Sequence, residues 1–466
     1  MQEKIYFYYT NDLHSNFSQW SRVAGYIKDK KASALLEQAS CYVLDVGDHV
    51  DRVHPITEAF MGKANVALMN DAGYDIATIG NNEGITLGKG DLYHLYDEAN
   101  FQVVCANLHH MTEPAPAWLK SHVYVQSMHG VKVGIIGLTA PFNDYYELLD
   151  WHVNDPFTVL EREINKLKPT ADIIVLLSHL GLSEDQAIAR RFPEIDVIIG
   201  GHTHHLLRTG ETINQTLLTA AGKHAYFIGE VLLTWDHDQQ QLVHKEAYAT
   251  DITHVAEDEQ TENKLLELTK QAEDRLGKTV VYLQEPIKVK WFEDTKIMEK
   301  LTETMKHWTK ADCAMLNSGV LLDELMEGDV TYQDIHRICP HPINPCVVEL
   351  NGNELLEVVR ASFTKELMEL PLKGFGFRGE LIGRMVFSGL TVRTKLYPDG
   401  YETVKEVLFH QEALDPNRTY TVAVADTFTF GRLLPEVARS ETKRYFLPEL
   451  LRDLLAYTLK KDFAKR

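Results

Sequence analysis

The chain has 466 residues, of which 44% are apolar, and a formal net charge of −20 at pH 7. This length exceeds what one hydrophobic core usually supports, so two domains are expected. So large an acidic excess excludes a nucleic-acid polymer or an anionic membrane as the main partner, because such partners need clustered Lys and Arg. No apolar run in the sequence approaches the length of a membrane span.

The amino terminus and the cysteines point to the cytoplasm. Residues 1–4 lead directly into an apolar segment at 5–9, without the basic region, long apolar stretch and cleavage site of a signal peptide. The five cysteines are odd in number, scattered and free of C-x-x-C spacing, as expected of reduced thiols. We therefore expect a cytoplasmic protein, and the sequence gives no indication of its oligomeric state.

The first half of the chain repeats one pattern, in which a short apolar run is followed at once by polar residues or glycine. Six such runs are predicted strands, at residues 5–9, 42–46, 76–79, 131–138, 173–177 and 197–199. Short, nearly uniform apolar runs are typical of strands buried on both faces. Helical patterns at 21–38, 57–71 and 156–167 separate several of them. The alternation predicts an α/β layered domain with its chemistry in the strand-end loops, closed by a hairpin at 227–233 and 241–248.

The composition changes near residue 255. Residues 255–276 are rich in charged, helix-favouring side chains, which predicts a helix between two domains. We place the first domain at 1–254, the connecting helix at 255–278 and the second domain at 279–466. Strand-like runs at 280–289, 313–316, 345–352, 385–392 and 419–425, with a turn signal at 397–400, predict an α+β second domain with more hairpins.

Side chains suited to metal binding follow five of the predicted strands. In chain order they are Asp12, His14, Asp48, Asn81, His179, His202 and His204. Taken singly, an Asp or His after a strand is more often a cap or turn residue. Independent caps would not favour metal-binding types at five strand ends, so a metal centre is the better interpretation. Carboxylates, a carboxamide and imidazoles suit divalent transition ions, whereas a structural zinc site is usually rich in Cys.

Two ions about 3.5–4 Å apart can share a hydroxide and stabilise an in-line displacement at phosphorus. A carboxylate between two such ions can bridge them, and Asp48 is the natural choice for that position.

The motifs together resemble those of the calcineurin-like metallophosphoesterases. Their order is Asp-x-His, Gly-Asp, Gly-Asn-x-Glu, Ser-His and Gly-His-x-His. Segments 10–14 (Thr-Asn-Asp-Leu-His) and 200–204 (Gly-Gly-His-Thr-His) are similar to the 5′-nucleotidase branch, as are 316–319, 328–332 and 347–352. The resemblance covers nearly the whole chain. It implies a four-layer α/β/β/α metallophosphoesterase domain followed by an α+β substrate domain of the 5′-nucleotidase type.

The resemblance also implies a ligand set and a function. One divalent ion would be held by Asp12, His14, Asp48 and His204, and the other by Asp48, Asn81, His179 and His202. The ions would be Mn²⁺, Zn²⁺, Co²⁺ or Fe²⁺. A metal-bound hydroxide would attack phosphorus, and the second domain would bind the nucleoside part of the substrate. The implied activity is hydrolysis of nucleotides or nucleotide-like phosphoesters and anhydrides.

The chain departs from the family at the third motif. Asn82 stands where the family has a histidine that contacts phosphate and assists the leaving group. A carboxamide can donate a hydrogen bond but cannot carry a proton near neutral pH, so anhydrides and activated esters should react better than alkyl monoesters. Local replacements are Arg52 for phosphate binding and His49, His54 or His205 for proton donation. The alternative for these residues is a solvated loop.

The second domain departs from the family as well. The arginine expected after Asn317 is Leu322, and segment 430–433 replaces the usual Gly-Gly-Asp-Gly. Aromatic side chains could still stack on a base, and an arginine could meet an anionic group, although core aromatics and a surface turn are equally good interpretations. The candidate substrate contacts are Asn317, Phe375, Phe377, Arg378, Phe428 and Phe430.

Two functions remain open from the sequence. The seven metal-ligand candidates favour a phosphohydrolase acting on a nucleotide or another small phosphorylated substrate. The missing histidine and arginine favour a metal-retaining nucleotide-binding protein with weak or no hydrolase activity. A purely structural metal site is disfavoured by the absence of Cys ligands.

Overall fold

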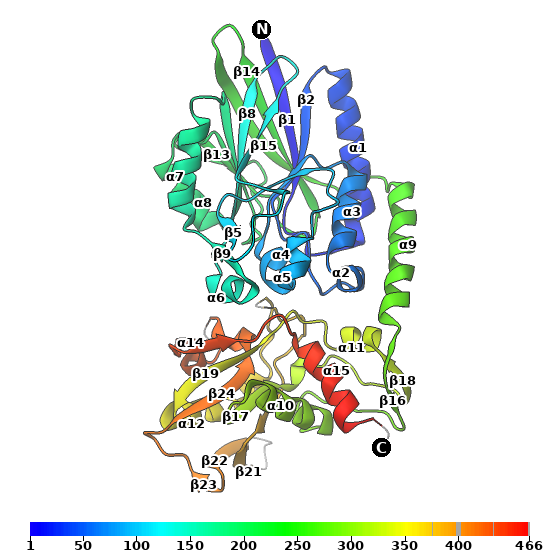
Figure 1. Cartoon of the computed structure of the whole chain (residues 1–466), viewed down its shortest axis with the longest axis vertical. Coiled ribbons are helices and arrows are strands. Elements are labelled where there is room, and N and C mark those ends of the chain that lie inside the picture. Colours follow the sequence, from blue (N-terminus) through cyan, green and yellow to red (C-terminus); the bar gives the residue numbers. More distant parts are fainter. Residues whose placement is uncertain (375, 398–401, 432, 465–466) are drawn as a thin grey trace. The chain divides into compact units, whose positions relative to one another are not determined.

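The computed structural model describes residues 1–374, 376–397, 402–431 and 433–464. The chain divides into two compact units, Met1–Ala272 and Glu273–Arg466 (Figure 1). The division falls within helix α9 (Glu259–Leu276). None of the helices in the described parts of the chain combines the length and apolar character that a bilayer crossing requires.

Two β-sheets form the centre of the first unit. The seven-stranded sheet has the order β15-β14-β1-β2-β3-β4-β6, and the six-stranded sheet has the order β12-β13-β11-β10-β8-β7. The first sheet consists of β1 (Gln2–Thr10), β2 (Ser40–Asp45), β3 (Ile76–Ala77), β4 (Gln102–Val104), β6 (Leu119–Lys120), β14 (Phe227–Asp236) and β15 (Gln241–Asp251). The second consists of β7 (His122–Gln126), β8 (Lys132–Thr139), β10 (Ile173–His179), β11 (Val197–Gly200), β12 (Glu211–Ile213) and β13 (Thr216–Thr219).

The pairing of these strands sets where the loops emerge. β1, β2, β3 and β4 run parallel to one another, as do β8, β10 and β11. The carboxyl ends of parallel neighbours therefore lie along one edge of each sheet. The predicted closing hairpin is confirmed, since β14 pairs antiparallel with β15 and also with β1.

The main core lies between the two sheets. Ile5 and Leu44 from one sheet and Val133, Val175 and Ile199 from the other are fully buried in a single apolar cluster. Such uniformly apolar strands cannot face water on either side, which explains the short apolar runs of the sequence. The outer face of each sheet must then be covered by helices.

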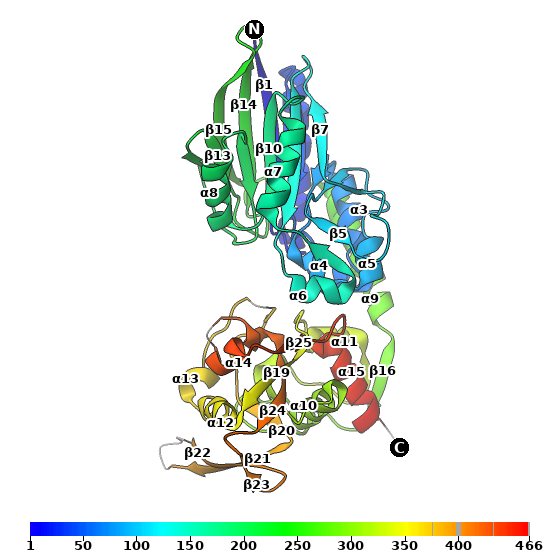
Figure 2. The same cartoon turned by 60° about the vertical axis from the view of Figure 1, so that its left-hand side comes forward.

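Helices cover both outer faces. α7 (Pro156–Leu167) and α8 (Leu182–Arg191) bury Leu160, Ile164 and Ile188 against the second sheet in another apolar cluster. α1 (Trp20–Leu36) packs on β2 and α3 (Lys63–Ala72) packs on α1. Figures 1 and 2 show these pairs of helices on opposite sides of the sheets. The predicted four-layer α/β/β/α order is confirmed.

The helix predicted at 57–71 is wrong in one respect, because the structure has two helices there. α2 (Pro55–Phe60) ends at Met61, whose φ is 48°, and Gly62 follows with φ 81° before α3 begins. Two consecutive left-handed residues break the helical hydrogen-bond ladder. Shorter elements complete the unit: α4 (Asn81–Thr86), α5 (Lys89–Tyr93), α6 (Asn143–Tyr146), β5 (Leu108–His110) and β9 (Trp151–Val153).

The second unit is built around a five-stranded sheet of order β20-β17-β24-β19-β25, with small sheets β21-β22-β23 and β16-β18. Its strands are β16 (Thr279–Leu283), β17 (Cys313–Asn317), β18 (Gly328–Thr331), β19 (Pro345–Asn351), β20 (Met385–Ser388), β21 (Leu390–Leu396), β22 (Glu402–Phe409), β23 (Glu412–Ala413), β24 (Thr419–Ala425) and β25 (Lys443–Tyr445). Its helices are α10 (Lys296–Thr309), α11 (Tyr332–Ile338), α12 (Gly352–Ala361), α13 (Lys365–Met368), α14 (Pro435–Arg439) and α15 (Leu451–Asp462). This confirms the predicted α+β architecture.

Three local predictions in the second unit need adjustment. The strand predicted at 280–289 ends at Leu283. The strand-like run at 345–352 ends at Asn351, whose side chain accepts hydrogen bonds from the first turn of α12. The run at 385–392 is interrupted by Gly389, whose φ is 84°. β21 and β22 pair as a hairpin, and its predicted turn at 397–400 falls largely on 398–401, outside the described residues.

Candidate metal centre

The ends of four strands bring Asp and His side chains together in the first unit. Ligand atoms of Asp12, His14 and His204 lie within 4.8 Å of one another, and so do those of Asp48, His179 and His202. Asp12 and His14 follow β1, Asp48 follows β2, His179 ends β10, and the other two histidines follow β11. Parallel pairing gathers the strand ends within each sheet, and the packing of the two sheets brings together residues as far apart in sequence as His14 and His204.

The backbone at these positions is strained. Five of the residues have a φ in the left-handed region: Asp12 (51°), His14 (50°), Asp48 (53°), His202 (71°) and His204 (57°). This conformation costs a non-glycine residue roughly 1–3 kcal/mol, and such strain concentrates at functional sites. Hydrogen bonds between loops hold the strained segments in place. The Asp12 N–H donates to Gly47 O at 3.0 Å, and the His14 N–H donates to Asp48 O at 2.8 Å.

The first group converges on one point. His14 Nε2 lies 3.0 Å from His204 Nε2. Asp12 Oδ1 lies 3.9 Å from His14 Nε2 and 3.5 Å from His204 Nε2. Ligands at the usual bond length of ~2.1 Å, placed at a right angle around a cation, would be ~3 Å apart. The spacing of the two nitrogens fits a shared divalent ion.

The second group presents unpaired ligand atoms. His179 Nδ1 lies 2.7 Å from Val46 O, so this nitrogen donates and Nε2 is left with its lone pair. His179 Nε2 is 3.3 Å from Asp48 Oδ1. Both His179 Nε2 and Asn81 Oδ1 are buried and have no hydrogen-bond partner among the described residues. Orphaned acceptors of this kind are costly unless a cation satisfies them.

Asp48 connects the two groups. Its Oδ1 faces His179, while its Oδ2 lies 3.8 Å from His14 Nε2. One carboxylate therefore reaches both sets of imidazoles, as a bridging ligand must. The Asn82 N–H also donates to Asp48 Oδ1 at 2.8 Å, which fixes the carboxylate.

The electrostatics of the centre favour a cation. Burial alone would raise the pKa of Asp48, but the charge and hydrogen bond of His179 lower it below its usual range. Burial alone would lower the pKa of His179, but Asp48 and Asp12 raise it to about 10. At His202, burial and then the charge of His179 lower the pKa to about 4. The buried carboxylates thus stabilise positive charge beside them, which is the property a metal site requires.

Two carboxylates without an assigned role in the sequence support the ligand loops. Glu83 is fully buried and accepts hydrogen bonds from the N–H groups of Asp48 (3.0 Å), Gly80 (2.9 Å) and Val50 (2.8 Å). Asp51, also fully buried, has its Oδ2 3.3 Å from His14 Nδ1. Glu83 belongs to the Gly-Asn-x-Glu motif, which was the available signal. No sequence motif marks Asp51, because its contact with His14 forms only when the chain folds.

A further histidine close to the centre was not predicted. The His224 ring is edge-on to the His14 ring, with 6.0 Å between centroids, and the backbone N–H of His224 donates to Asp12 O at 2.9 Å. Burial and the charge of His14 lower the pKa of His224 to about 4. This residue lies in the loop before β14, where no apolar run or motif marks it in the sequence.

The predicted replacements for the family histidine have other partners. The Arg52 guanidinium bonds both carboxylate oxygens of Glu58, at 2.8 and 3.0 Å, and donates to Thr86 O. The His49 ring is buried and packs edge-on against Trp20. These contacts are structural, and they oppose the predicted roles of Arg52 in phosphate binding and His49 in proton donation.

The remaining histidine candidates differ from each other in exposure. His54 Nδ1 accepts the Ile56 N–H at the start of α2, so it serves as a helix cap. The exposed His205 lies 2.8 Å from Thr203 Oγ1 through its Nδ1. Asn82 does belong to the centre, because its Nδ2 is 2.7 Å from His14 Nδ1.

The candidate base-stacking residues of the second unit are mostly part of its core. Phe428 is fully buried and Phe377 is 2% exposed, so neither ring presents a face to a ligand. Phe377 instead stacks on His341, with 5.1 Å between centroids and 5° between planes. These two positions oppose the predicted stacking roles, whereas Phe430 is half-buried and keeps part of its surface exposed. Phe375 lies outside the described residues.

The other two candidates of the second unit also have internal contacts. Asn317 is buried, and its Nδ2 donates to Ile382 O at 2.9 Å. Arg378 is half-buried, and its N–H donates to His341 Nδ1 at 2.9 Å. The Arg378 guanidinium contacts Phe377 O at 3.3 Å.

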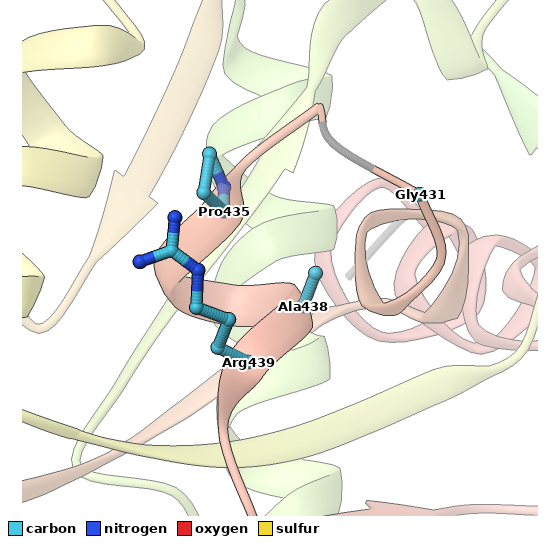
Figure 3. A pocket seen from close by; sticks show the side chains of 4 residues that line it. All are labelled: Gly431, Pro435, Ala438 and Arg439. Carbon is cyan, nitrogen blue, oxygen red and sulfur yellow. The ribbon is translucent and has the colours of Figure 1, made fainter.

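A cavity of about 490 Å³ lies in the second unit, next to helix α14. It is lined by Gly431 and by Pro435, Ala438 and Arg439 of α14. Figure 3 shows the Arg439 side chain extending along this helix beside Pro435. Among the described residues, the cavity lining combines the apolar Pro435 and Ala438 with the cationic Arg439, a combination suited to an anionic organic molecule.

Comparison with known proteins assigns the two units. Residues 5–206 match the calcineurin-like phosphoesterase family, and residues 275–432 match the 5′-nucleotidase C-terminal domain. Over 460 residues the chain is 42% identical to YunD of Bacillus subtilis (strain 168), an uncharacterized metallophosphoesterase, with 98% of this chain and 100% of the relative covered. The chain belongs to the metallophosphoesterase/5′-nucleotidase family. Calcineurin-like phosphoesterases use binuclear metal centres, in keeping with the two groups of Asp and His.

Proteins of lower identity are similar to this chain over most of its length. The 5′-nucleotidase of Rattus norvegicus is 25% identical over 403 residues, which cover 74% of this chain and 69% of that protein. The 5′-nucleotidase precursor of Thermus thermophilus has a TM-score of 0.61 at 20% identity, covering 99% of this chain and 97% of that one. The NAD nucleotidase of Haemophilus influenzae has a TM-score of 0.68 at 15% identity, again covering 99% and 97%. At these identities the structural likeness shows the fold alone.

Proposed function

We propose that this protein is a binuclear-metal phosphohydrolase acting on nucleotides or on nucleotide-like phosphoesters and anhydrides. The observation that carries the proposal is the pair of Asp and His groups that meet at Asp48. Two divalent ions held there would supply a nucleophilic water at neutral pH and neutralise charge on the phosphoryl oxygens. The similarity to characterised 5′-nucleotidases supports a small phosphorylated substrate.

The donor set of each proposed ion is mixed. Asp12, His14, His204 and Asp48 would hold one ion, and Asp48, Asn81, His179 and His202 would hold the other. Two oxygen donors and two nitrogen donors at each position suit Mn²⁺, Zn²⁺, Co²⁺ or Fe²⁺ and exclude a thiolate-selective metal. The chain carries a net charge of −20, so local cations are needed to attract a phosphate.

We propose that the second unit binds the base or other organic group of the substrate. The half-buried Phe430 precedes Gly431, which lines the cavity with Arg439. Arg439 is exposed, so its guanidinium can approach an anionic or aromatic ligand. We propose that a base stacks on Phe430 and that Arg439 contacts an anionic or polar group of the same substrate.

The partners of Asn82, Arg52 and His49 support a preference for good leaving groups. Asn82 cannot carry a proton near neutral pH, Arg52 is bonded to Glu58, and burial lowers the pKa of His49 to about 3. An alkyl alkoxide needs a proton as it leaves, whereas a phosphate or a phenolate leaves without one. Dinucleotides, sugar nucleotides and aryl phosphates should therefore be hydrolysed faster than nucleoside monophosphates.

The test is a substrate screen on protein stripped of metal and reconstituted with Mn²⁺, Co²⁺ or Zn²⁺. Native chain and Asp48→Asn are compared on nucleoside monophosphates, dinucleotides, sugar nucleotides and an aryl phosphate. The expected result is metal-dependent hydrolysis of anhydrides by the native chain, with at least a ~100-fold loss of kcat in Asp48→Asn. Hydrolysis by the native chain that is fastest on alkyl monoesters contradicts the leaving-group argument.

A second candidate function is supported by the same observation on Asn82. If no side chain protonates any leaving group, the chain can retain metal and nucleotide without turning it over. Calorimetric titration with nucleotides in the presence of each metal separates the two functions. Binding in the micromolar range, with no product released over hours, would identify the metal-retaining nucleotide-binding protein.

A further inference from the structure

The imidazole of His14 has distinct surroundings at its two nitrogens. Nε2 faces the candidate ion position, with His204 Nε2 at 3.0 Å and Asp48 Oδ2 at 3.8 Å. Nδ1 faces away from it, with Asn82 Nδ2 at 2.7 Å and Asp51 Oδ2 at 3.3 Å. The chemistry of Nδ1 therefore decides whether Nε2 offers a lone pair.

A neutral imidazole carries its proton on one nitrogen only. To bind a cation through Nε2, His14 must hold the proton at Nδ1 and donate it to an acceptor. The Asp51 carboxylate is such an acceptor. The Asn82 amide can serve as well, because a 180° rotation about its last bond exchanges its nitrogen for its oxygen at nearly the same position.

Asp51 is held rigidly where it meets His14. Its side chain is fully buried, and its Oδ1 accepts the Val53 N–H at 3.0 Å. Its own N–H donates to Ser15 Oγ at 2.8 Å. Ser15 follows His14 directly and also accepts hydrogen bonds from Thr57 Oγ1 at 2.8 Å and Asn65 Nδ2 at 3.0 Å. The loop after β1 and the loop after β2 are therefore tied together at this carboxylate.

Asn82 is held by its backbone. Its N–H donates to Asp48 Oδ1 at 2.8 Å, and it lies in the first turn of α4, directly after Asn81. The Asn82 side chain is 8% exposed, and its short distance to His14 Nδ1 leaves it little freedom to reach a substrate.

We propose that Asp51 and Asn82 are positioning residues for His14. Asp51 holds the proton at Nδ1, so that Nε2 presents its lone pair to the ion, and Asn82 fixes the plane of the ring. Asn82 thus supports a ligand of one ion, whereas the histidine that the family has at this position acts on the substrate. The inference rests on the proposed function, because it needs the ion that His14 would hold.

Asp51 and Asn82 contact a histidine of only one of the two ligand groups. His14 belongs to the group with Asp12 and His204, and the side chains of Asp51 and Asn82 both contact this histidine at Nδ1. Loss of an outer hydrogen bond to a ligating histidine typically weakens metal binding by about 10–100-fold. Removing the Asp51 carboxylate or the Asn82 amide should therefore weaken the site that contains His14 and leave the other unchanged.

The experiment is calorimetric titration of Mn²⁺ and of Zn²⁺ into metal-stripped native chain, Asp51→Ala and Asn82→Ala. The control is Glu147→Gln, which removes a carboxylate from another His–carboxylate pair, formed with His152 at 2.8 Å. Thermal unfolding of each metal-stripped variant reports whether it folds. Nitrogen-detected NMR of the native chain reports the His14 tautomer with Zn²⁺ bound.

The expected result is two sites in the native chain and in Glu147→Gln, with a Kd about 10–100-fold higher at one site only in Asp51→Ala and Asn82→Ala. The Zn²⁺-bound native chain should show the His14 proton at Nδ1, a result that does not depend on any variant folding. Unchanged titrations in folded variants, equal weakening of both sites, or a proton at Nε2 would overturn the inference alone. Absence of metal binding to the native chain would overturn the proposed function as well.

Discussion

Replacing Glu83 by alanine removes the acceptor of three buried backbone N–H groups. They belong to Asp48, Val50 and Gly80, so the change frees the loop after β2 from the loop after β3. A buried donor left without a partner costs ~1–3 kcal/mol, and water can enter part of the space of the lost side chain, so we expect a total of ~4 kcal/mol.

This loss should be visible in thermal unfolding of the metal-stripped protein. An unfolding entropy of ~2.1 cal/mol/K per residue gives ~0.6 kcal/mol/K for the unit of residues 1–272, so the expected fall in Tm is ~7 °C. The control is Glu98→Ala, an exposed carboxylate expected to change stability by less than ~0.5 kcal/mol. If Glu83→Ala unfolds within ~2 °C of the native chain, Glu83 does not anchor the ligand loops.

Three further predictions concern the residues around the centre and the second unit. Arg52→Leu should destabilise the chain by ~3–5 kcal/mol, because it removes both guanidinium bonds to the buried Glu58 carboxylate. KM of the folded variant should stay unchanged, and a raised KM with native Tm would restore Arg52 as a phosphate contact. Phe430→Ala should raise KM for a nucleotide without changing Tm, whereas Phe428→Ala should lower the free energy of unfolding by ~3–5 kcal/mol. A raised KM in Phe428→Ala together with a loss of stability in Phe430→Ala would contradict the role of Phe430 as the stacking residue. Burial, followed by the charge of Asp48, raises the pKa of Glu83 to about 7 from 4.5, so its contribution to stability is complete below pH 4.5 and is lost as the pH rises through 7. The metal-stripped native chain should lose about 3 kcal/mol relative to Glu83→Gln between about pH 5 and 8, and parallel pH profiles in urea denaturation would refute this.

Much of the first unit could be predicted because its strands are buried on both faces. An apolar run that ends in Asp or His marks both a strand and the loop after it, and the parallel order brings such loops to one edge. For this reason the sequence predicts Asp12, Asp48 and His179 as parts of one site. The meeting of strand ends from the two packed sheets, rather than any single motif, makes them a site.

The outer residues of the site could not be predicted in the same way. Asp51 meets His14 only because the loops after β1 and β2 are tied through Ser15, and no local pattern encodes that contact. Arg52 is in the same loop, yet its guanidinium is bonded to Glu58 in the following helix. The residue types of Asp51 and Arg52 indicate which interactions these side chains can make, and tertiary packing decides that their partners are His14 and Glu58.

The aromatic residues of the second unit show the same limit. Phe428 and Phe430 are two positions apart, and the sequence offers no reason to prefer one as a stacking surface. A 3-10 turn at Asp426–Thr429 buries the first, and the chain leaves that turn at the second. Composition alone does not separate a core aromatic from a ligand contact.

The central claim is that two ions share Asp48. Its most direct test is the number of Mn²⁺ ions bound per chain, measured by equilibrium dialysis and elemental analysis for native protein and Asp48→Ala, with hydrolysis of a dinucleotide followed in the same samples. Two ions are expected in the native chain, with hydrolysis that rises as the second ion binds. Asp48→Ala should lose hydrolysis and bind ions more weakly at both positions. One ion per native chain, or full hydrolysis with a single ion bound, would contradict it.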